Sequence, residues 1–256
     1  MLKLWTALVL LVACALPAAA QQSGEAETDS DPTKPVFLSA RPEFYKISDD
    51  VQRSVLIARY DTAVLKGSGL FISKPGIIMR FEVPLAHGSA FGNRATGLGD
   101  AYGQFFLLPY ASRRFVWVAG SGLILPTATD RLLGGGKWIA APVTVPVWRL
   151  PRGLFFVKVQ NFVSFAGDDT RPDVNFLLIA PTLITAVGRG WWILLDTETK
   201  SDWRVDGRTG VKSGFQVGRR LKRSLGLWVK PEVWWGPNRD GDWNIKFGVI
   251  LYQRPR

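Results

Sequence analysis

His87 and Ser89 are the pair of side chains whose types and spacing would support nucleophilic catalysis. His87 is the single histidine among 256 residues, and Ser89 follows two positions later. An imidazole base can remove the proton of a serine hydroxyl and activate it for attack on an acyl group. The segment 87–99 is rich in glycine and is predicted to be a loop, and no third group that would orient the histidine is identifiable. We therefore assign no catalytic residue and keep hydrolysis as an alternative.

A run of charged residues at 168–173 raises a second chemical question, that of a Ca²⁺ site. Asp168, Asp169 and Asp173 carry carboxylates, and Arg171 lies among them. Carboxylate oxygens are good Ca²⁺ ligands, but the ligand spacing of an EF-hand loop is not present. An outer loop held by salt bridges is the favoured interpretation. The sequence shows no cysteine or histidine cluster for a transition metal, and it predicts no cofactor.

Charged residues at alternate positions form the third group of candidates, and they indicate a pore. Successive side chains of a β-strand alternate between two faces, so charges at every second position share one face. The predicted inward-facing, pore-lining residues are Lys158, Lys200, Lys212, Arg220, Lys230, Lys246, Asp196, Glu198, Asp202 and Glu232. More cations than carboxylates predicts a slight preference for anions. The alternative is that these charges pair across neighbouring strands and close the lumen.

The segments that carry these charges have the pattern of transmembrane strands. In 153–165, 225–235 and 243–252 one face is polar and the other is apolar. The apolar face is aromatic at its ends and aliphatic in the middle, as expected where strands cross a bilayer and rings lie at the two interfaces. This pattern predicts an all-β fold, a transmembrane antiparallel up-and-down β-barrel.

The connections between the predicted strands alternate between short and long. Short turns such as 151–153 and 187–190 alternate with longer, charged or glycine-rich segments such as 127–137 and 167–173. Outer-membrane barrels have short periplasmic turns and longer outer loops. Eleven strands are visible, and a periplasmic N-terminus requires one more, for which 35–44 is a poor candidate because Pro42 removes a ladder donor. The prediction is about twelve strands, with ten or fourteen as alternatives.

The N-terminal residues predict export. Residues 1–20 have one lysine, an apolar run and Ala18-Ala19-Ala20, the pattern of a secretory signal peptide cleaved after Ala20. Lipidation at Cys14 is the alternative, because Leu11-Val12-Ala13-Cys14 has the form of a lipoprotein box. Residues 21–35 are polar and acidic and are predicted to be a disordered tail, which leaves 36–254 for the barrel.

Charge and the final strand predict the partners. The net charge of +11 is spread along the chain rather than clustered, so we do not expect nucleic acid as a partner. We do expect contact with an anionic lipid surface. The spacing of Lys246, Gly248, Ile250 and Tyr252 resembles the assembly signal on the last strand of outer-membrane barrels. We expect this strand to be read by the barrel-assembly machinery and the protein to reside in the bacterial outer membrane. The oligomeric state is left open, since a lipid-facing surface and a subunit contact are both apolar.

Residues 94–252 resemble the outer-membrane transporters named for the MetA pathway of phenol degradation. The matching stretches, in order, are Leu98-Gly99-Asp100, Pro126-Thr127-Ala128-Thr129-Asp130, Leu133-Gly134, Lys137-Trp138, Phe165-Ala166-Gly167-Asp168, Arg171-Pro172-Asp173-Val174-Asn175 and Asp202-Trp203. The resemblance implies a single-chain barrel with a channel or transport role for small solutes. The family name suggests an aromatic solute, whereas the excess of inward-facing cations suggests an anionic one. A closed structural barrel is the main alternative. A lipid-active hydrolase or acyltransferase is a further one, because His87-x-Ser89 resembles the spacing in outer-membrane phospholipase and lipid A deacylase barrels.

Overall fold

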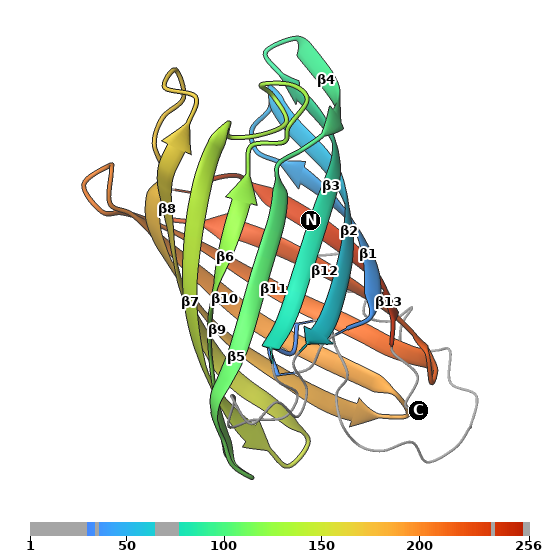
Figure 1. Ribbon diagram of the computed structural model, residues 1–256. Helices are drawn as coiled ribbons and strands as arrows, with labels where there is room; N and C mark the ends of the chain where they lie inside the picture. The colour runs from blue at the N-terminus through green and yellow to red at the C-terminus, as the bar shows by residue number, and fades with distance from the viewer. Residues whose placement is uncertain (1–29, 34–35, 65–76, 237–238, 253–256) are drawn as a thin grey trace.

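The computed structural model describes residues 30–33, 36–64, 77–236 and 239–252, whose strands form one antiparallel sheet (Figure 1). The strands are β1 (Leu38–Lys46), β2 (Val51–Val64), β3 (Ile77–Ala90), β4 (Asn93–Leu98), β5 (Ala101–Ala111), β6 (Phe115–Leu125), β7 (Lys137–Leu150), β8 (Gly153–Gly167), β9 (Asn175–Gly188), β10 (Trp191–Asp202), β11 (Arg208–Lys222), β12 (Leu225–Trp235) and β13 (Trp243–Leu251). No helix in these ranges is long and apolar enough to cross a membrane.

The sheet closes on itself as a twelve-stranded barrel. β4 and β5 both pair antiparallel with β3, β4 along Leu85–Ala90 and β5 along Ile78–Glu82. They are therefore two parts of one barrel strand, interrupted at Gly99 and Asp100. β1 pairs antiparallel with both β2 and β13, which joins the two ends of the sheet. The predicted fold class and strand number are confirmed.

Pro42 lies in the first strand, at the seam where the barrel closes. On the β13 side, the pairing of β1 skips Arg41 and Pro42 between Ala40 and Glu43. On the β2 side the register is continuous, with Pro42 opposite Leu56. The missing N–H of proline is thus accommodated by a local gap in one ladder. The predicted segment 35–44 does supply the twelfth strand, as β1.

The connections follow the predicted alternation, with one exception. Turns at 112–114, 151–152, 189–190 and 223–224 lie at one end, and the loops 126–136, 168–174 and 203–207 lie at the other. We call these the periplasmic and outer ends. The expectation of a long loop at 87–99 is wrong. Phe91 and Gly92 have positive φ values of 49° and 82° and form a tight hairpin between β3 and β4, so the pairing extends through this region. The predicted turn near residues 66–69 lies outside the described residues.

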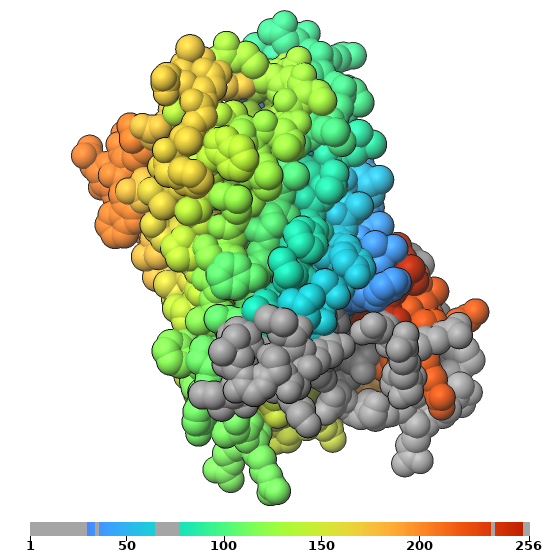
Figure 2. All heavy atoms as spheres, in the orientation of Figure 1, coloured from blue at the N-terminus to red at the C-terminus, as the bar shows by residue number. Residues whose placement is uncertain are grey.

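The outer surface of the barrel is apolar where the strands cross the bilayer. Large side chains such as Val83, Leu85, Leu195 and Phe247 are exposed on it. In water such a surface would be an aggregation hazard, whereas in lipid it is required. Figure 2 shows the side of the barrel on which β5 to β8 form a continuous wall. At the periplasmic end, rings of Tyr110, Phe115, Trp148 and Phe155 contact one another in sequence, as in an interfacial aromatic girdle.

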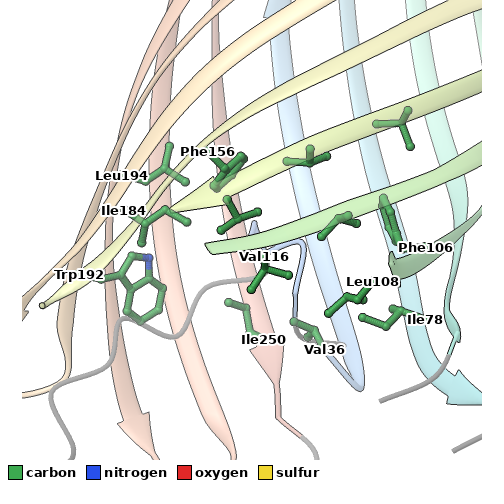
Figure 3. Packing of buried hydrophobic residues seen from close by; sticks show 14 of the residues in the cluster. Val36, Ile78, Phe106, Leu108, Val116, Phe156, Ile184, Trp192, Leu194 and Ile250 are labelled. Carbon is green, nitrogen blue, oxygen red and sulfur yellow. The ribbon is translucent and has the colours of Figure 1, made fainter. Parts of the chain in front are cut away.

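Buried apolar side chains form a cluster at the periplasmic end of the interior, and we call this cluster the apolar plug (Figure 3). The plug consists of Val36, Ile78, Phe106, Leu108, Val116, Val118, Val143, Val145, Val147, Phe156, Ile184, Trp192, Leu194, Trp228 and Ile250. Inward-facing glycines make room for its two indoles. A Cβ at Gly218 or Gly248 would lie within 2.1 Å of the Trp192 ring or 2.0 Å of the Trp228 ring. The two rings therefore lie over glycines of the directly paired strands, Trp192 over Gly218 and Trp228 over Gly248.

Candidate functional site

Outward of the apolar plug, ionisable side chains ring the middle of the barrel, and we call them the charge belt. Its cations are Arg41, Arg59, Arg80, Lys158, Lys212, Lys230 and Lys246, and its carboxylates are Glu43, Asp61, Glu82, Asp196, Glu198 and Glu232. Most of these side chains line a cavity of about 410 Å³. Strand alternation aims them inward, because their neighbours along each strand are the exposed apolar residues of the lipid face.

On β10 to β13 the belt is a continuous salt-bridge network. Lys230 Nζ lies 2.5 Å from Asp196 Oδ2 and 2.8 Å from Glu232 Oε1. Lys246 Nζ lies 2.8 Å from Glu232 Oε2, and Lys212 lies 3.0 Å from Glu198. Lys230 and Lys246 are directly opposite in the β12–β13 ladder, which would be repulsive without a bridging anion. Glu232, only 2% exposed, supplies that anion.

On β1 to β3 the belt repeats one local pattern, an arginine followed two residues later by an acid. Arg59 and Arg80 share Asp61, at 2.5 Å and 3.3 Å. Arg41 pairs with Glu43, and Arg41 also lies 3.6 Å from the Glu82 carboxylate. Glu43 accepts a hydrogen bond from the Tyr45 hydroxyl as well. Sequence analysis missed this half of the belt. The signal was present in Arg41-x-Glu43, Arg59-x-Asp61 and Arg80-x-Glu82, since the i,i+2 spacing puts opposite charges on one face.

The predicted pore-lining residues fall into two groups. Lys158, Lys212, Lys230, Lys246, Asp196, Glu198 and Glu232 line the cavity. The other three lie nearer the barrel ends. Lys200 lies towards the outer end and pairs with Asp240 at 2.9 Å, and Asp202 accepts a hydrogen bond from the backbone of Arg204. Arg220 donates to the Lys222 and Arg223 carbonyls near the periplasmic turn. Salt bridges join most of the cavity-lining charges, as the pairing alternative expects.

Lys158 differs from the rest of the belt. It lies on β8, and no carboxylate of the described residues comes within 4 Å of its ammonium. Its neighbour on the same face, Gln160, donates from Nε2 to the Tyr102 hydroxyl at 3.0 Å and to the Ala141 carbonyl at 3.3 Å. Tyr102 reaches Gln160 because Gly122 lies beneath its ring, where a Cβ would come within 2.3 Å of the hydroxyl. This wall of the cavity therefore presents an unpaired cation beside an ordered phenol.

The N-terminal segment enters the barrel. Val36 belongs to the apolar plug, and its N–H donates to Asp61 Oδ2 at 3.2 Å. Ser30 and Pro32 line the belt cavity, while Asp31 is buried and accepts hydrogen bonds from Thr33. Most of the predicted signal peptide and tail, residues 1–29, lies outside the described residues. The described part of the 21–35 tail is packed inside the barrel.

The stretches that carried the family resemblance converge at the outer end. Asp100 accepts hydrogen bonds from the backbone of Ala128 and Gly135, at 3.1 Å and 2.6 Å. Thr127 accepts from the Ala101 N–H and donates to the Gly99 carbonyl. These bonds fold the loop 126–136 inward until Leu133 is fully buried against Val55 and Ala86. The motifs thus build a loop that packs against buried residues of β2 and β3 at the outer end.

The acidic loop residues are part of the same outer network. Asp173 accepts from Lys137 at 2.9 Å and from Arg204 at 3.2 Å, and the Lys137 ammonium lowers the pKa of this carboxyl. Asp168 accepts from the hydroxyl and backbone N–H of Thr170, which lowers its pKa. Arg171 donates to the Arg131 carbonyl at 2.6 Å, while Asp169 is exposed. These contacts describe a salt-bridged loop.

His87 and Ser89 lie on β3, so the expectation that they lie in a loop is wrong. Both are on the outward face with Leu85, beyond the hydrophobic band. His87 Nδ1 is 2.7 Å from Thr96 Oγ1 on the paired strand β4. In the described chain this hydrogen bond goes to Thr96 and not to Ser89, so the histidine is not placed as a base for the serine.

Comparison with known proteins places the fold but not the family. No family model matches this chain, and no curated protein matches it, so the resemblance to the MetA-pathway transporters is not confirmed. Solved structures do match. An outer-membrane channel from Pseudomonas putida F1 aligns with a TM-score of 0.66 at 11% identity, over 89% of this chain and 100% of that one. The NanC porin aligns with a TM-score of 0.60 at 10% identity over 84% and 100%, and the KdgM porin with 0.57 at 9% over 85% and 99%. The chain therefore has the fold of an outer-membrane β-barrel.

Proposed function

We propose that this protein is an outer-membrane channel that passes small anionic solutes. The observation that carries the proposal is the charge belt around its cavity. In a barrel with a purely structural role, an apolar interior would be more stable than buried ionisable groups, because burying charges costs free energy. The cavity is lined by more cations than carboxylates, which suits a path for small anions.

The comparisons support this proposal. The three similar barrels named above are porins or channels, and one KdgM porin structure was solved in complex with disordered oligogalacturonate, an acidic sugar polymer. Because identity is near 10%, this support concerns the kind of barrel and not its solute. The aromatic solute implied by the MetA resemblance stays a prediction.

A closed structural barrel is the second candidate, and the apolar plug favours it. The indoles of Trp192 and Trp228 are buried in the apolar cluster at the periplasmic end, and Ser30 and Pro32 line the belt cavity. Hydrophobic constrictions also act as gates, so the plug is compatible with a channel that opens. The two candidates differ in whether ions pass.

Planar-bilayer conductance of the refolded mature protein decides between them. Refolding is verified first by the difference in gel mobility between unheated and boiled samples. We expect discrete current steps and, under a salt gradient, a reversal potential that shows anion preference. A folded barrel that gives no steps over long recordings would reject the channel and leave the closed barrel.

We also infer export to the outer membrane and insertion through the last strand. The inward face of the C-terminal segment carries Lys246, Gly248, Ile250 and Tyr252. This last strand must close the barrel, because an open strand edge in lipid would leave backbone N–H and C=O groups unpaired. Mass spectrometry of the mature chain tests cleavage after Ala20 against lipidation at Cys14. Fractionation tests the location: recovery in the soluble fraction would contradict the inference.

A further inference from the structure

Lys158 is the belt cation for which the described residues provide no carboxylate partner. Each of the other six belt cations has a carboxylate oxygen within 4 Å among the described residues: Arg41, Arg59, Arg80, Lys212, Lys230 and Lys246. Lys158 has none. An ammonium held in a barrel interior without a counter-ion is costly, so this position favours any anion that can reach it.

The charges around Lys158 further favour the binding of an anion at this position. The charged groups with the largest influence on it are Glu198, Lys212, Lys230 and Arg80, three cations and one carboxylate. The carboxylate is already bound, since Glu198 lies 3.0 Å from Lys212. Asp61, the partner of Arg80, is shared with Arg59. Among the described residues, no carboxylate therefore lies within 4 Å of the Lys158 ammonium at this wall of the cavity.

A hydrogen-bond donor stands beside the cation. Gln160, two residues from Lys158 on the same strand face, donates to the oxygen of Tyr102. The Tyr102 hydroxyl accepts that bond, which leaves its own hydrogen for an acceptor in the cavity that both residues line. Phe156 and Phe162, which also line the cavity, give it apolar walls. An ammonium and a phenol donor over apolar surface suit a compact organic carboxylate.

We propose that Lys158, with the Tyr102 hydroxyl, forms a binding site for the carboxylate of a small organic acid. This inference rests on the proposed function, because a permeating anion would bind at this site on its way through the channel. The salt bridges of Lys212, Lys230 and Lys246 position the strands around it. Of the belt cations in the described residues, Lys158 is the one without a salt bridge, and it would bind the solute carboxylate.

Isothermal titration of detergent-refolded protein with D-glucuronate tests the site, with D-glucose as the uncharged probe of similar size. We expect glucuronate to bind and glucose not to bind. Lys158→Met should raise the Kd for glucuronate by about tenfold or more, because a charge-assisted hydrogen bond is lost. Lys158→Arg should retain binding. Lys200→Met is the matched control, since Lys200 faces the same interior but pairs with Asp240 outside the belt cavity, and it should leave the Kd unchanged.

The outcomes separate this site from the proposed function. Equal Kd values for wild type and Lys158→Met, or no binding of glucuronate to folded wild type, would overturn the site even if the barrel conducts. Binding that depends on Lys158 in a barrel without current steps would retain the site and reject the channel. Gel mobility verifies folding of each variant, and Lys158→Gln replaces the methionine variant if that one does not fold.

Discussion

The apolar plug and the charge belt fill the same barrel in opposite ways. Both are built from inward-facing residues at alternate strand positions, and both join neighbouring strands. In the plug, rings such as Trp192 and Trp228 lie over glycines and leave no room between strands. In the belt, long side chains reach one another across the wall, as Lys230 does to Asp196 on a strand two positions away, and a cavity remains.

If the protein is the proposed channel, this difference separates the place that limits transport from the place that selects the solute. Twelve strands enclose a lumen that large rings can narrow, whereas extended charged chains held against the wall by salt bridges leave space at its centre. In the proposed channel, the plug would set whether ions pass, and the belt would set which charge is favoured. Each role can be altered separately, in the following order of expected effect.

Opening the plug should give the largest change. Trp228→Ala removes the indole that covers Gly248 and should raise single-channel conductance by about twofold or more, because a hydrophobic constriction is widened. The same change should lower the free energy of unfolding by about 3 kcal/mol, the cost of losing a large buried ring. Bilayer recordings and urea unfolding in detergent measure the two effects. Val233→Ala, on the exposed face of the same strand, is the control, and an equal conductance gain there would contradict the assignment of the plug as the constriction.

Removal of residues 21–33 from the mature chain tests the other occupant of the interior. Ser30 and Pro32 line the belt cavity, so their loss should enlarge it and raise conductance while anion preference is retained. Recordings from the truncated and full-length chains measure both properties. If the truncated barrel folds and conducts as the full chain does, the segment does not restrict the path.

Two lysines of the belt separate stability from selectivity. Lys230→Met leaves Asp196 and Glu232 without a shared cation and should destabilise the barrel by about 2 kcal/mol. This loss is smaller than that for breaking a fully buried ion pair, because each carboxylate keeps access to the cavity or to a second partner such as Lys246. Lys158→Met breaks no salt bridge and removes an uncompensated charge, so it should keep or raise the unfolding midpoint while reducing anion preference. Urea midpoints and reversal potentials provide the two readouts. A large loss of stability in Lys158→Met would show that Lys158 has a structural partner.

The strand pattern made the barrel predictable, while long-range contacts set the limits of sequence reasoning. Alternation over β8 to β13 identified Lys158, Lys230, Lys246 and Glu232 as inward-facing, because a period of two is local to each strand. The hairpin at Phe91 was missed because glycine-rich strands and loops have similar composition. No local signal distinguishes Lys158 from Lys230. Their difference lies in which carboxylates the barrel brings from neighbouring strands.

Release of the outer loop should have a smaller effect on the path. Asp100→Ala removes the acceptor that holds the backbone of Ala128 and Gly135 and should free the loop 126–136 from the entrance. We expect faster proteolysis at Arg131 and a modest rise in current noise, with the anion preference of the belt unchanged. Asp130→Ala is the matched control, because Asp130 bonds only within the loop, to the Leu132 N–H. Equal cleavage rates in the two variants would show that Asp100 does not anchor the loop.

The smallest expected effect is a pH dependence confined to the outer loop 168–174. Lys137 lowers the pKa of Asp173, so the folded loop binds this proton less readily than the unfolded chain does. The stabilisation is therefore complete above the ordinary pKa of aspartate, near 3.9, and is lost as pH falls through the lowered value. Asp173 is half exposed, so screening by solvent keeps the effect small. Hydrogen exchange of the Val174 amide, measured across this pH range, should show protection falling in wild type and remaining flat in Asp173→Asn. The belt and plug amides should not respond, and parallel loss of protection there would mean that acid acts on the whole barrel rather than on this loop.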